Sequence, residues 1–293
     1  MVLADSCQGA SPEAIADRVR RSLRCQVPVD VAEVARSLGA SIDLSDILTG
    51  SGCLLPSGRS YHILLKSSDS SHRQRFTIGH EIGHILHSKG ELQARTKRHG
   101  DVETACNRFA AALLVPSQNI TADLHRSRNF ADALVSSARK FAVSREVVAL
   151  RLKDLGMPLA TIFWRAYSHR GGKTALRVAW SSAPGRLFIP KFTLMDKKVK
   201  LYKVSPSDEL YLASLRLGDL RGMYTLHASW SNDILITSVV LSEGHSQFKR
   251  SPRRACAFRV SRDVTQRPAG VDRVTELPLF SRHGGAVPVA YGS

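Results

Sequence analysis

Two histidines and a glutamate in the stretch FTIGHEIGHILHS have the spacing of a hydrolytic metal site, His80-Glu81-x-x-His84. Residues four apart lie on one face of a helix, so the two imidazoles can share one metal ion. Zinc suits two imidazoles and a carboxylate and keeps a fourth position open for water, whose proton Glu81 could take. The pattern predicts zinc-dependent hydrolysis. The alternative is three polar residues on an ordinary helix.

A third ligand must come from another segment of the chain. Glu103 lies on the next expected helix, and its rivals are His87, His99 and Asp101. His87 stands two turns, about 10 Å, along the axis from His80, too far to share one ion with it on a straight helix. The other two rivals lie in a charged segment where solvation explains them. The residues favour Glu103 mildly, since a glutamate there also suits the helix dipole.

Apolar residues surround the motif and indicate a largely buried helix: Phe76, Ile78, Ile82, Ile85 and Leu86. Unpaired His and Glu side chains would be costly in such a setting, so they require a metal or hydrogen-bond partners. Gly83 costs about 1 kcal/mol relative to alanine inside a helix. Its expected use is to let another segment approach the metal face closely.

Four helices and a small sheet are expected to position these residues. The helices are predicted at 11–24, 30–39, 70–88 and 102–115, with Asp30 as an N-cap and Gly39 as a stop. Short, partly alternating segments between residues 40 and 66 predict a small antiparallel sheet. The predicted fold class is α+β, with a mainly helical domain around the motif.

The stretch DALVSSARKFAVSREVVALRLKDLG has the spacing of a helix-turn-helix. Ser144 is the expected N-cap of a second helix that exposes Arg145, Arg151 and Lys153, as a DNA-recognition helix would. A plain helical hairpin that packs domains together explains the pattern equally well. The segment could also bind the helix-turn-helix domain of a substrate.

After Pro158 the sequence becomes rich in β-branched and aromatic residues and predicts a β-rich domain. A short helix is expected within SDELYLASLRLG, a strand within RLFIPKFTL, and a loose tail from Thr265. The basic clusters KKVK and FKRSPRR are interpreted mainly as solvated turns. The predicted domains are therefore residues 1–119, 120–160 and 161–293.

Composition narrows the class of protein further. Lys and Arg number 42 and Asp and Glu 25, giving a net charge of +17 that would attract nucleic acid or an acidic partner. Five scattered cysteines argue against a disulfide framework. No apolar run is long enough to span a membrane, and no secretory signal is visible, so we expect a cytoplasmic protein without membrane contact.

Three segments in order resemble the ImmA/IrrE family of metallopeptidases: VDVAEVARSLGASIDL, RQRFTIGHEIGHILH and ETACNRFAAALLVP, followed by the helix-turn-helix-like segment. The resemblance covers about half of the chain. It implies a zincin-like peptidase domain, metal ligation by His80, His84 and Glu103, and Glu81 as general base. In the IrrE branch, which the three-part layout resembles more closely, the third domain is GAF-like and is thought to sense a signal.

Members of that family cleave helix-turn-helix repressor proteins and so relieve repression of DNA-damage or mobile-element genes. The resulting hypothesis is a zinc-dependent endopeptidase with a repressor as substrate, with Mn²⁺ as another possible metal. The rival hypothesis is a DNA-binding transcriptional regulator whose metal site is structural or vestigial. Weak, non-specific DNA binding would be compatible with either, given the net charge.

Overall fold

The structure is a computed structural model of the whole chain. It describes residues 10–94, 98–127, 129–168, 174–185, 187–194, 200–205, 210–217, 220–231, 234–241 and 255–257. The described residues belong to one compact unit. The expected loose tail and the cluster FKRSPRR lie outside the described residues. No helix among the described residues is long and apolar enough to cross a membrane.

The first two helices begin and end where local rules place them. Helix α1 (Pro12–Ser22) is capped by Ser11, whose hydroxyl accepts a hydrogen bond from the Ala14 amide. Helix α2 (Val31–Ser37) is capped by the Asp30 carboxylate. After it Gly39 adopts a φ of +83°, a left-handed conformation that ends the helix at little cost for glycine.

The small sheet is mixed, and the expectation of an antiparallel sheet was wrong. Its strands are β1 (Ala40–Ser45), β2 (Gly52–Ser57) and β3 (Ser60–Lys66), in the order β1-β3-β2. The β2–β3 hairpin turns tightly at Gly58 and places β3 in the middle, antiparallel to β2 and parallel to β1. Short strands carry no sequence signal for which neighbour they will pair with.

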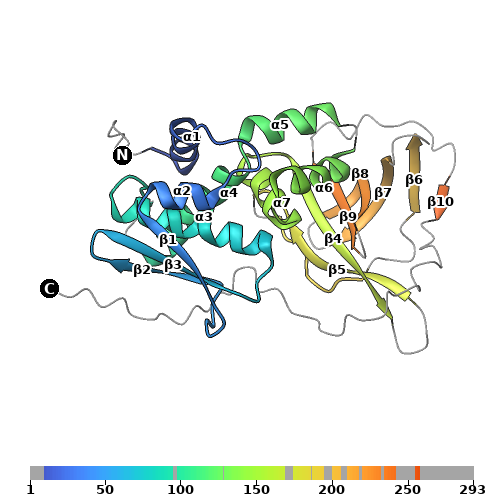
Figure 1. Cartoon of the computed structure of the whole chain (residues 1–293). Coiled ribbons are helices and arrows are strands. Elements are labelled where there is room, and N and C mark those ends of the chain that lie inside the picture. The colour runs from blue at the N-terminus through green and yellow to red at the C-terminus, as the bar shows by residue number, and fades with distance from the viewer. Residues whose placement is uncertain are drawn as a thin grey trace. The chain divides into compact units, whose positions relative to one another are not determined.

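Helices α3 (Ser71–Ser88) and α4 (His99–Leu114) pack along each other in the core of the N-terminal part. Figure 1 shows α3 between the small sheet and the other helices. Helix α4 begins at His99, three residues before the expected start, because the end of the expected charged loop already forms its first turn. Residues 95–97 of that loop lie outside the described residues.

Three further helices follow: α5 (Ser117–Arg126), α6 (Phe130–Phe141) and α7 (Arg145–Asp154). Ser144 caps α7 as expected, by accepting a hydrogen bond from the Val147 amide. The expectation of an exposed Arg151 was wrong, since it is only 4% exposed. Only Lys153 and Asp154 of α7 are exposed, because the helix packs against α4, α6 and the large sheet.

A seven-stranded antiparallel sheet follows, in the order β10-β6-β7-β8-β9-β4-β5. Its strands are β4 (Leu159–Ser168), β5 (Thr174–Ser182), β6 (Lys200–Ser205), β7 (Leu210–Leu217), β8 (Leu220–Ser231), β9 (Ile234–Val240) and β10 (Ala255–Ala257). The helix expected in SDELYLASLRLG is instead strand β7, which pairs with β6 and β8. The strand expected in RLFIPKFTL reduces to one bridge, between Leu194 and Arg177.

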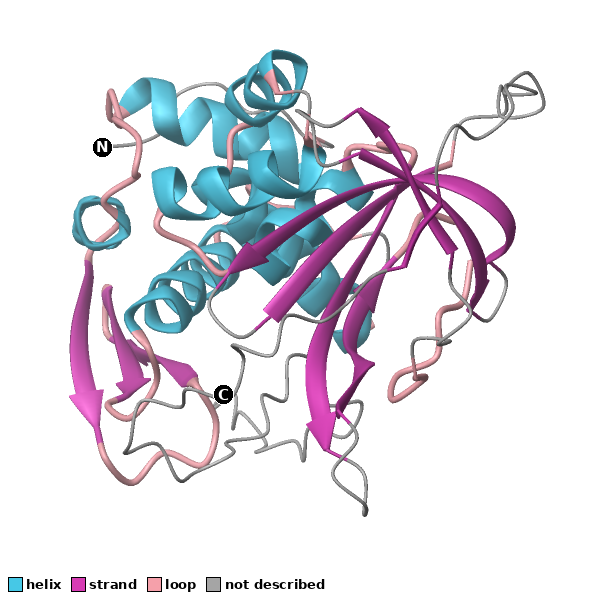
Figure 2. Ribbon diagram, turned by 90° about the vertical axis from the view of Figure 1, so that its right-hand side faces the viewer, coloured by secondary structure: helices cyan, strands magenta, loops and turns pink. Residues whose placement is uncertain are grey.

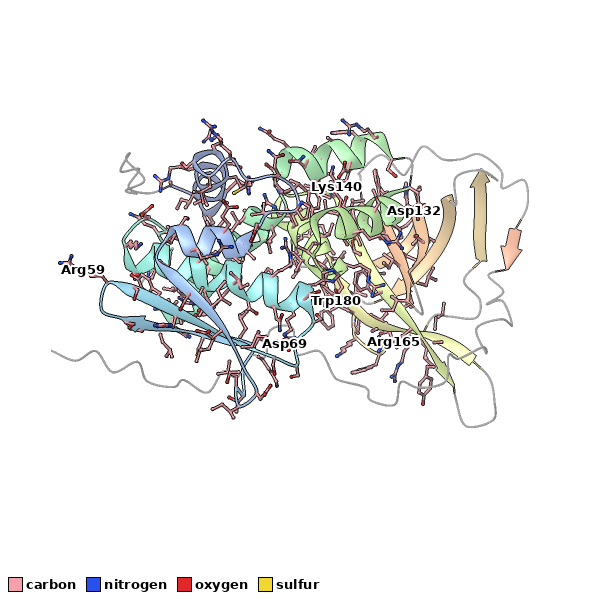
Figure 3. The ribbon with its side chains drawn as sticks, in the orientation of Figure 1. Arg59, Asp69, Asp132, Lys140, Arg165 and Trp180 are labelled. Carbon is pink, nitrogen blue, oxygen red and sulfur yellow. The ribbon has the colours of Figure 1, made fainter. Side chains whose placement is uncertain are left out.

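The large sheet shares its core with the helices. Figure 2 shows the helices against one face of this sheet. Helix α6 contacts β8 and β9, while α7 contacts β4 and β5. Leu134, Leu152, Phe163 and Ile236 belong to one apolar cluster. Trp180, labelled in Figure 3, contacts Phe163 with the two rings tilted by 37° and their centroids 4.9 Å apart. The division at residues 119 and 160 stays a prediction.

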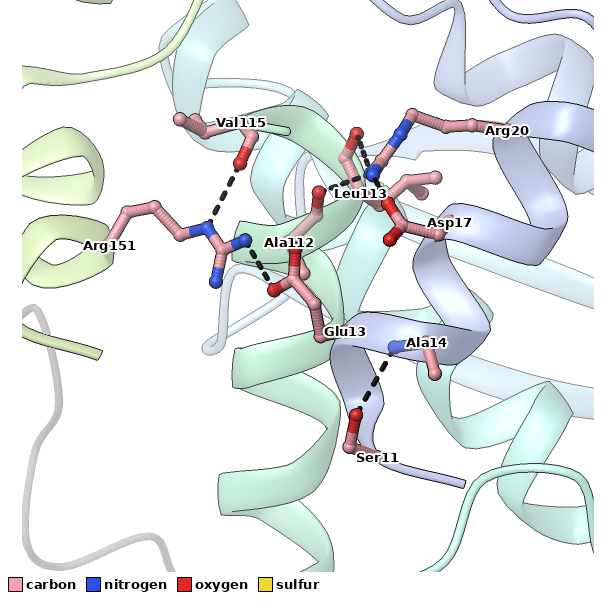
Figure 4. A network of polar contacts seen from close by, with 9 residues as sticks. All are labelled: Ser11, Glu13, Ala14, Asp17, Arg20, Ala112, Leu113, Val115 and Arg151. Atoms are coloured by element: carbon pink, nitrogen blue, oxygen red, sulfur yellow. Dashed lines mark hydrogen bonds and ion pairs between the residues drawn. The ribbon is translucent and has the colours of Figure 1, made fainter. Parts of the chain in front are cut away.

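Two arginines hold the end of α4 (Figure 4). Arg20 of α1 donates to the carbonyls of Ala112 and Leu113 and pairs with Asp17. These carbonyls lie in the last turn of the helix, where no later backbone amide of the helix can reach them. A guanidinium carries five donors in a fixed fork, so one side chain can satisfy several acceptors.

Arg151 of α7 completes this arrangement from the other side. Its Nε donates to the Val115 carbonyl at 2.9 Å, and its Nη2 pairs with the Glu13 carboxylate of α1. Three helices, α1, α4 and α7, therefore meet at one largely buried cation. Removing such a charge leaves its partners without compensation.

We expect Arg151→Met to lower the free energy of unfolding by about 3 kcal/mol, because Glu13 and the Val115 carbonyl lose their partner. Urea denaturation followed by circular dichroism measures this loss. Lys153→Met is the matched control on the exposed side of α7 and should change stability by less than about 0.5 kcal/mol. Equal losses in the two variants would contradict the assigned role of Arg151.

Candidate metal centre

Three side chains from two helices converge in the N-terminal part of the chain. Nε2 of His80 lies 3.0 Å from Nε2 of His84 and 3.2 Å from Oε2 of Glu103. Nε2 of His84 lies 3.1 Å from Oε1 of Glu103. Within the described residues these three are the group whose ligand atoms, all within 4.8 Å of one another, could hold a metal ion.

The other candidates for the third metal ligand, His87, His99 and Asp101, lie outside the converging group. Nδ1 of His87 lies 2.8 Å from the Leu92 carbonyl, so its ring fastens the turn that follows α3. His99 approaches Glu103 at 3.7 Å, but its side chain is 85% exposed and it is not one of the converging group. Asp101 lies in the first turn of α4, outside the group as well. The structure thus brings Glu103 to the two histidines.

The chemistry of the three donors fits a zinc ion. Two imidazole nitrogens and one carboxylate oxygen form a common catalytic zinc set. Bonds of about 2.0–2.1 Å in tetrahedral geometry require donor atoms about 3.3 Å apart, and the donors here already lie 3.0–3.2 Å apart. A shift of a few tenths of an ångström is sufficient.

Hydrogen bonding around His80 supports the same interpretation. Its Nδ1 lies 2.9 Å from Oδ1 of Asn107, a carbonyl oxygen that can only accept, so Nδ1 carries the hydrogen. In the neutral ring Nε2 therefore presents a lone pair to His84 and Glu103. Lone pairs that converge in this way require a cation or a proton between them.

The convergence of His80, His84 and Glu103 shifts the pKa values of Glu103 and His80. Hydrogen bonds from His80 and His84 hold the pKa of Glu103 well below its usual range. Burial opposes charge on His80, but its hydrogen bond to Glu103 and the nearby carboxylates outweigh burial and raise the pKa of His80. Both shifts have the same direction: they favour a positive charge where His80 and Glu103 converge.

Glu81 lies next to His80 on α3 and is only 6% exposed. Burial raises the pKa of the Glu81 carboxyl, although the charges of His80 and His84 oppose the shift. No bond from the three converging donors uses this carboxylate. It is therefore available for proton transfer beside the converging group.

Two glycines on α3 allow α4 to approach closely. A Cβ added at Gly83 would lie 3.0 Å from both the Cα and the Cβ of Cys106, and one added at Gly79 would lie 3.3 Å from the Cβ of Ala110. The expectation that Gly83 admits a neighbouring segment agrees with this contact. Cys106 itself is buried, and burial raises the pKa of its thiol to about 12, so it stays protonated.

The residues of RQRF that precede the motif anchor the first turn of α3. Arg73 donates from Nε to the Ser51 hydroxyl at 2.7 Å and pairs with Asp69, which is labelled in Figure 3. Gln74 donates to the Lys66 carbonyl at 3.1 Å. These two side chains connect the first turn of α3 to Ser51, just before β2, and to Lys66, the last residue of β3.

Arg75 fastens the same turn to the helices. It donates to the Ala142 carbonyl at 3.0 Å and to the Val29 carbonyl at 2.8 Å. Ala142 forms the left-handed turn between α6 and α7, with a φ of +51°. Neither Arg75 nor Asn107 carries a sequence signal of its role, apart from the position of Asn107 one turn after Glu103.

The segment that carries this centre is similar to known proteins. Residues 44–153 match the family described as the IrrE N-terminal-like domain, Peptidase_M78. Over 136 residues the chain is 35% identical to the radiation response metalloprotease IrrE of Deinococcus deserti, covering 41% of this chain and 48% of that protein. Over 90 residues it is 34% identical to the protein of the same name from Deinococcus radiodurans, covering 28% and 27%.

The matched segment thus spans about half of the first relative and about a quarter of the second. Among solved structures, one described as a Mycobacterium tuberculosis transcriptional regulator is similar with a TM-score of 0.48 and 16% identity. The similarity covers 80% of this chain and 77% of that one.

We expect Gly83→Ala to lower zinc affinity about tenfold or more, because the added methyl group pushes α3 and α4 apart where the donors must meet. Overpacking should cost about 1–3 kcal/mol and outweigh the roughly 1 kcal/mol that alanine gains in helix propensity. Competition titration with a zinc chelator and thermal unfolding measure the two effects.

Gly100→Ala is the matched control, since an added Cβ there meets nothing within 4 Å on the same helix pair. This variant should keep zinc affinity and should be as stable as the parent or slightly more so. Unchanged zinc affinity in Gly83→Ala would show that helix spacing does not limit the centre.

Proposed function

We propose that the protein is a zinc-dependent endopeptidase that cleaves a helix-turn-helix transcriptional repressor, because residues 44–153 match the family described as the IrrE N-terminal-like domain. Cleavage would derepress stress genes of the DNA-damage response or genes of a mobile element. The observation that carries the proposal is the convergence of His80, His84 and Glu103 beside the buried Glu81.

In the proposed mechanism His80, His84 and Glu103 hold the metal and Glu81 acts as general base. Zinc, when bound, supplies the Lewis acidity that peptide hydrolysis needs at neutral pH, and Mn²⁺ could replace it in the cell. Glu81 takes the proton of the attacking water and passes it to the leaving amine. Such a proton transfer typically contributes 10²- to 10⁴-fold to the rate.

The substrate class rests on similarity to radiation response metalloproteases. The net charge of +17 would favour a substrate with an acidic surface or one that is bound to DNA. We also propose that the β-rich part is a GAF-like sensor domain. The proposed domain boundaries lie at residues 119 and 160. Control of activity by metal supply or by this part would protect other proteins of the cell.

Burial of α7 weighs against the rival function of a DNA-binding regulator. A recognition helix needs several exposed side chains along one face to reach base edges. In α7 only Lys153 and Asp154 are exposed, and Arg151 is bound to Glu13 and the Val115 carbonyl. Base-specific contacts from this helix would require the core around it to open.

We expect Glu81→Gln to abolish cleavage, by at least about 10²-fold in rate, while zinc affinity stays within a few-fold of the parent. Glutamine keeps the shape of the side chain but cannot accept the proton. Glu33→Gln, an exposed change in α2, is the control and should be fully active. Cleavage by Glu81→Gln at the parent rate would rule out the mechanism.

Metal removal is expected to abolish cleavage reversibly. Dialysis against a chelator should yield an inactive protein, and one equivalent of Zn²⁺ should restore activity. Elemental analysis of the purified protein should find about one zinc per chain. A chelated protein with full activity, or a chain that takes up no metal, would rule out the metallopeptidase.

The substrate class has its own experiment. Helix-turn-helix repressors from the same genome are co-expressed with the protein, and intact-mass analysis shows whether any of them is cut at one bond. The Glu81→Gln variant serves as the negative control in each pair. A protein that cuts only unrelated substrates would keep the peptidase proposal and remove the repressor.

A further inference from the structure

Asn107 contacts the candidate metal centre although it is neither one of the three converging donors nor the proposed general base. It lies on α4 one turn after Glu103, so both side chains leave the same face of the helix. Its Oδ1 lies 2.9 Å from Nδ1 of His80. The two turns of α4 therefore contact the two nitrogens of one imidazole: Glu103 reaches Nε2 and Asn107 reaches Nδ1.

The direction of this hydrogen bond has a chemical consequence. A carbonyl oxygen accepts and cannot donate, so the hydrogen must lie on Nδ1 of His80. In a neutral imidazole the other nitrogen then carries the lone pair. Nε2 is thus the nitrogen that a metal can use, and it already faces His84 and Glu103, where it donates a hydrogen bond to the carboxylate as long as no metal is bound. A ring with the hydrogen on Nε2 could not bind a metal from that nitrogen.

The geometry that permits this contact is specific to the helix pair. An asparagine side chain is short, and it reaches His80 only because Gly83 and Gly79 let α4 lie against α3. The neighbouring residues of α4 take other roles. Cys106 packs against Gly83, while Arg108 is exposed on the opposite side. Asn107 is therefore placed to bind Nδ1 of His80, the ring nitrogen that does not face the other two donors.

We propose that Asn107 is a positioning residue that fixes the tautomer and the orientation of His80 and thereby sets the metal affinity of the centre. The proposal rests on the metal-binding part of the proposed function and is independent of the substrate. Outer partners of this kind typically change metal affinity by 10- to 100-fold when they are removed. A role limited to helix packing would change stability and leave the tautomer as it is.

The test compares Asn107→Leu, which removes the acceptor at similar size, with Asn107→Asp, which keeps an oxygen at the same place. The first readout is the tautomer of His80 in metal-free protein that also carries Glu103→Ala, because the Glu103 carboxylate would otherwise compete for the ring hydrogen at Nε2. The tautomer is read from the two ring ¹⁵N shifts at a pH where the ring is neutral. The parent and Asn107→Asp should carry the hydrogen on Nδ1. Asn107→Leu should lose this preference.

The second readout is zinc affinity by chelator competition. It should fall by about 10- to 100-fold in Asn107→Leu and return to within a few-fold of the parent in Asn107→Asp. Asn119→Leu, the same substitution at a half-buried position of α5, is the matched control and should leave both readouts unchanged. Thermal unfolding of all variants separates the effect from a loss of fold.

An unchanged tautomer and zinc affinity in Asn107→Leu would overturn the proposal. So would a loss of affinity that Asn107→Asp does not restore, because packing alone would then explain it. Failure of the proposed function gives a different result. A protein that binds no zinc, or cleaves no repressor, would still show the tautomer of His80, and the first readout judges Asn107 by itself.

Discussion

The close approach of α3 and α4 is the constraint on which the candidate metal centre depends. The ligands come from two helices, and the side chains of His80 and Glu103 can meet only where the backbones lie near each other. Gly83 and Gly79 provide that proximity by leaving no Cβ between the helices. The loss of about 1 kcal/mol per glycine in helix propensity is offset where it permits packing that a side chain would block.

Given this spacing, three buried or half-buried arginines hold the ends of the two helices. Arg75 holds the beginning of α3 to the carbonyls of Val29 and Ala142, and Arg20 and Arg151 hold the last carbonyls of α4. Burial lowers the pKa of Arg75 and of Arg20, yet a guanidinium keeps its proton at neutral pH. Part of the net charge of +17 is therefore used inside the fold, and its size overstates the charge available to a partner.

Local rules in the sequence predicted the motif helix well, and also the starts of three other helices. Ser11, Asp30 and Ser144 each precede a helix and cap it, because capping depends on only three or four neighbouring residues. The histidine face followed from helix geometry alone. Glu103 was favoured only mildly, since its distance from His80 depends on how two helices pack and not on either helix.

Non-local pairing explains what the sequence could not predict. Strand β7 alternates too weakly to distinguish it from a short helix, and its strand form is secured by β6 and β8 on either side. The parallel partner of β1 is likewise chosen by the β2–β3 hairpin. Arg151 was expected on an exposed face because the segment was interpreted as a recognition helix, whereas its neighbours in space leave only Lys153 and Asp154 of the helix exposed.

The α6–α7 pair shows that a sequence with helix-turn-helix spacing can form a helical hairpin that connects other parts of the fold. At the start of α6, Asn129 donates to the Ala228 carbonyl of β8, and the Phe130 amide donates to Nδ1 of His227 at 3.0 Å. At its end, Ala142 accepts from Arg75 of the motif helix. The pair thus joins the large sheet to both helices of the metal centre. Releasing α7 to bind DNA would break the hydrogen bonds of Arg151 and expose Leu152 of the core. The contacts that hold the pair inside the protein therefore oppose a role in recognising DNA bases.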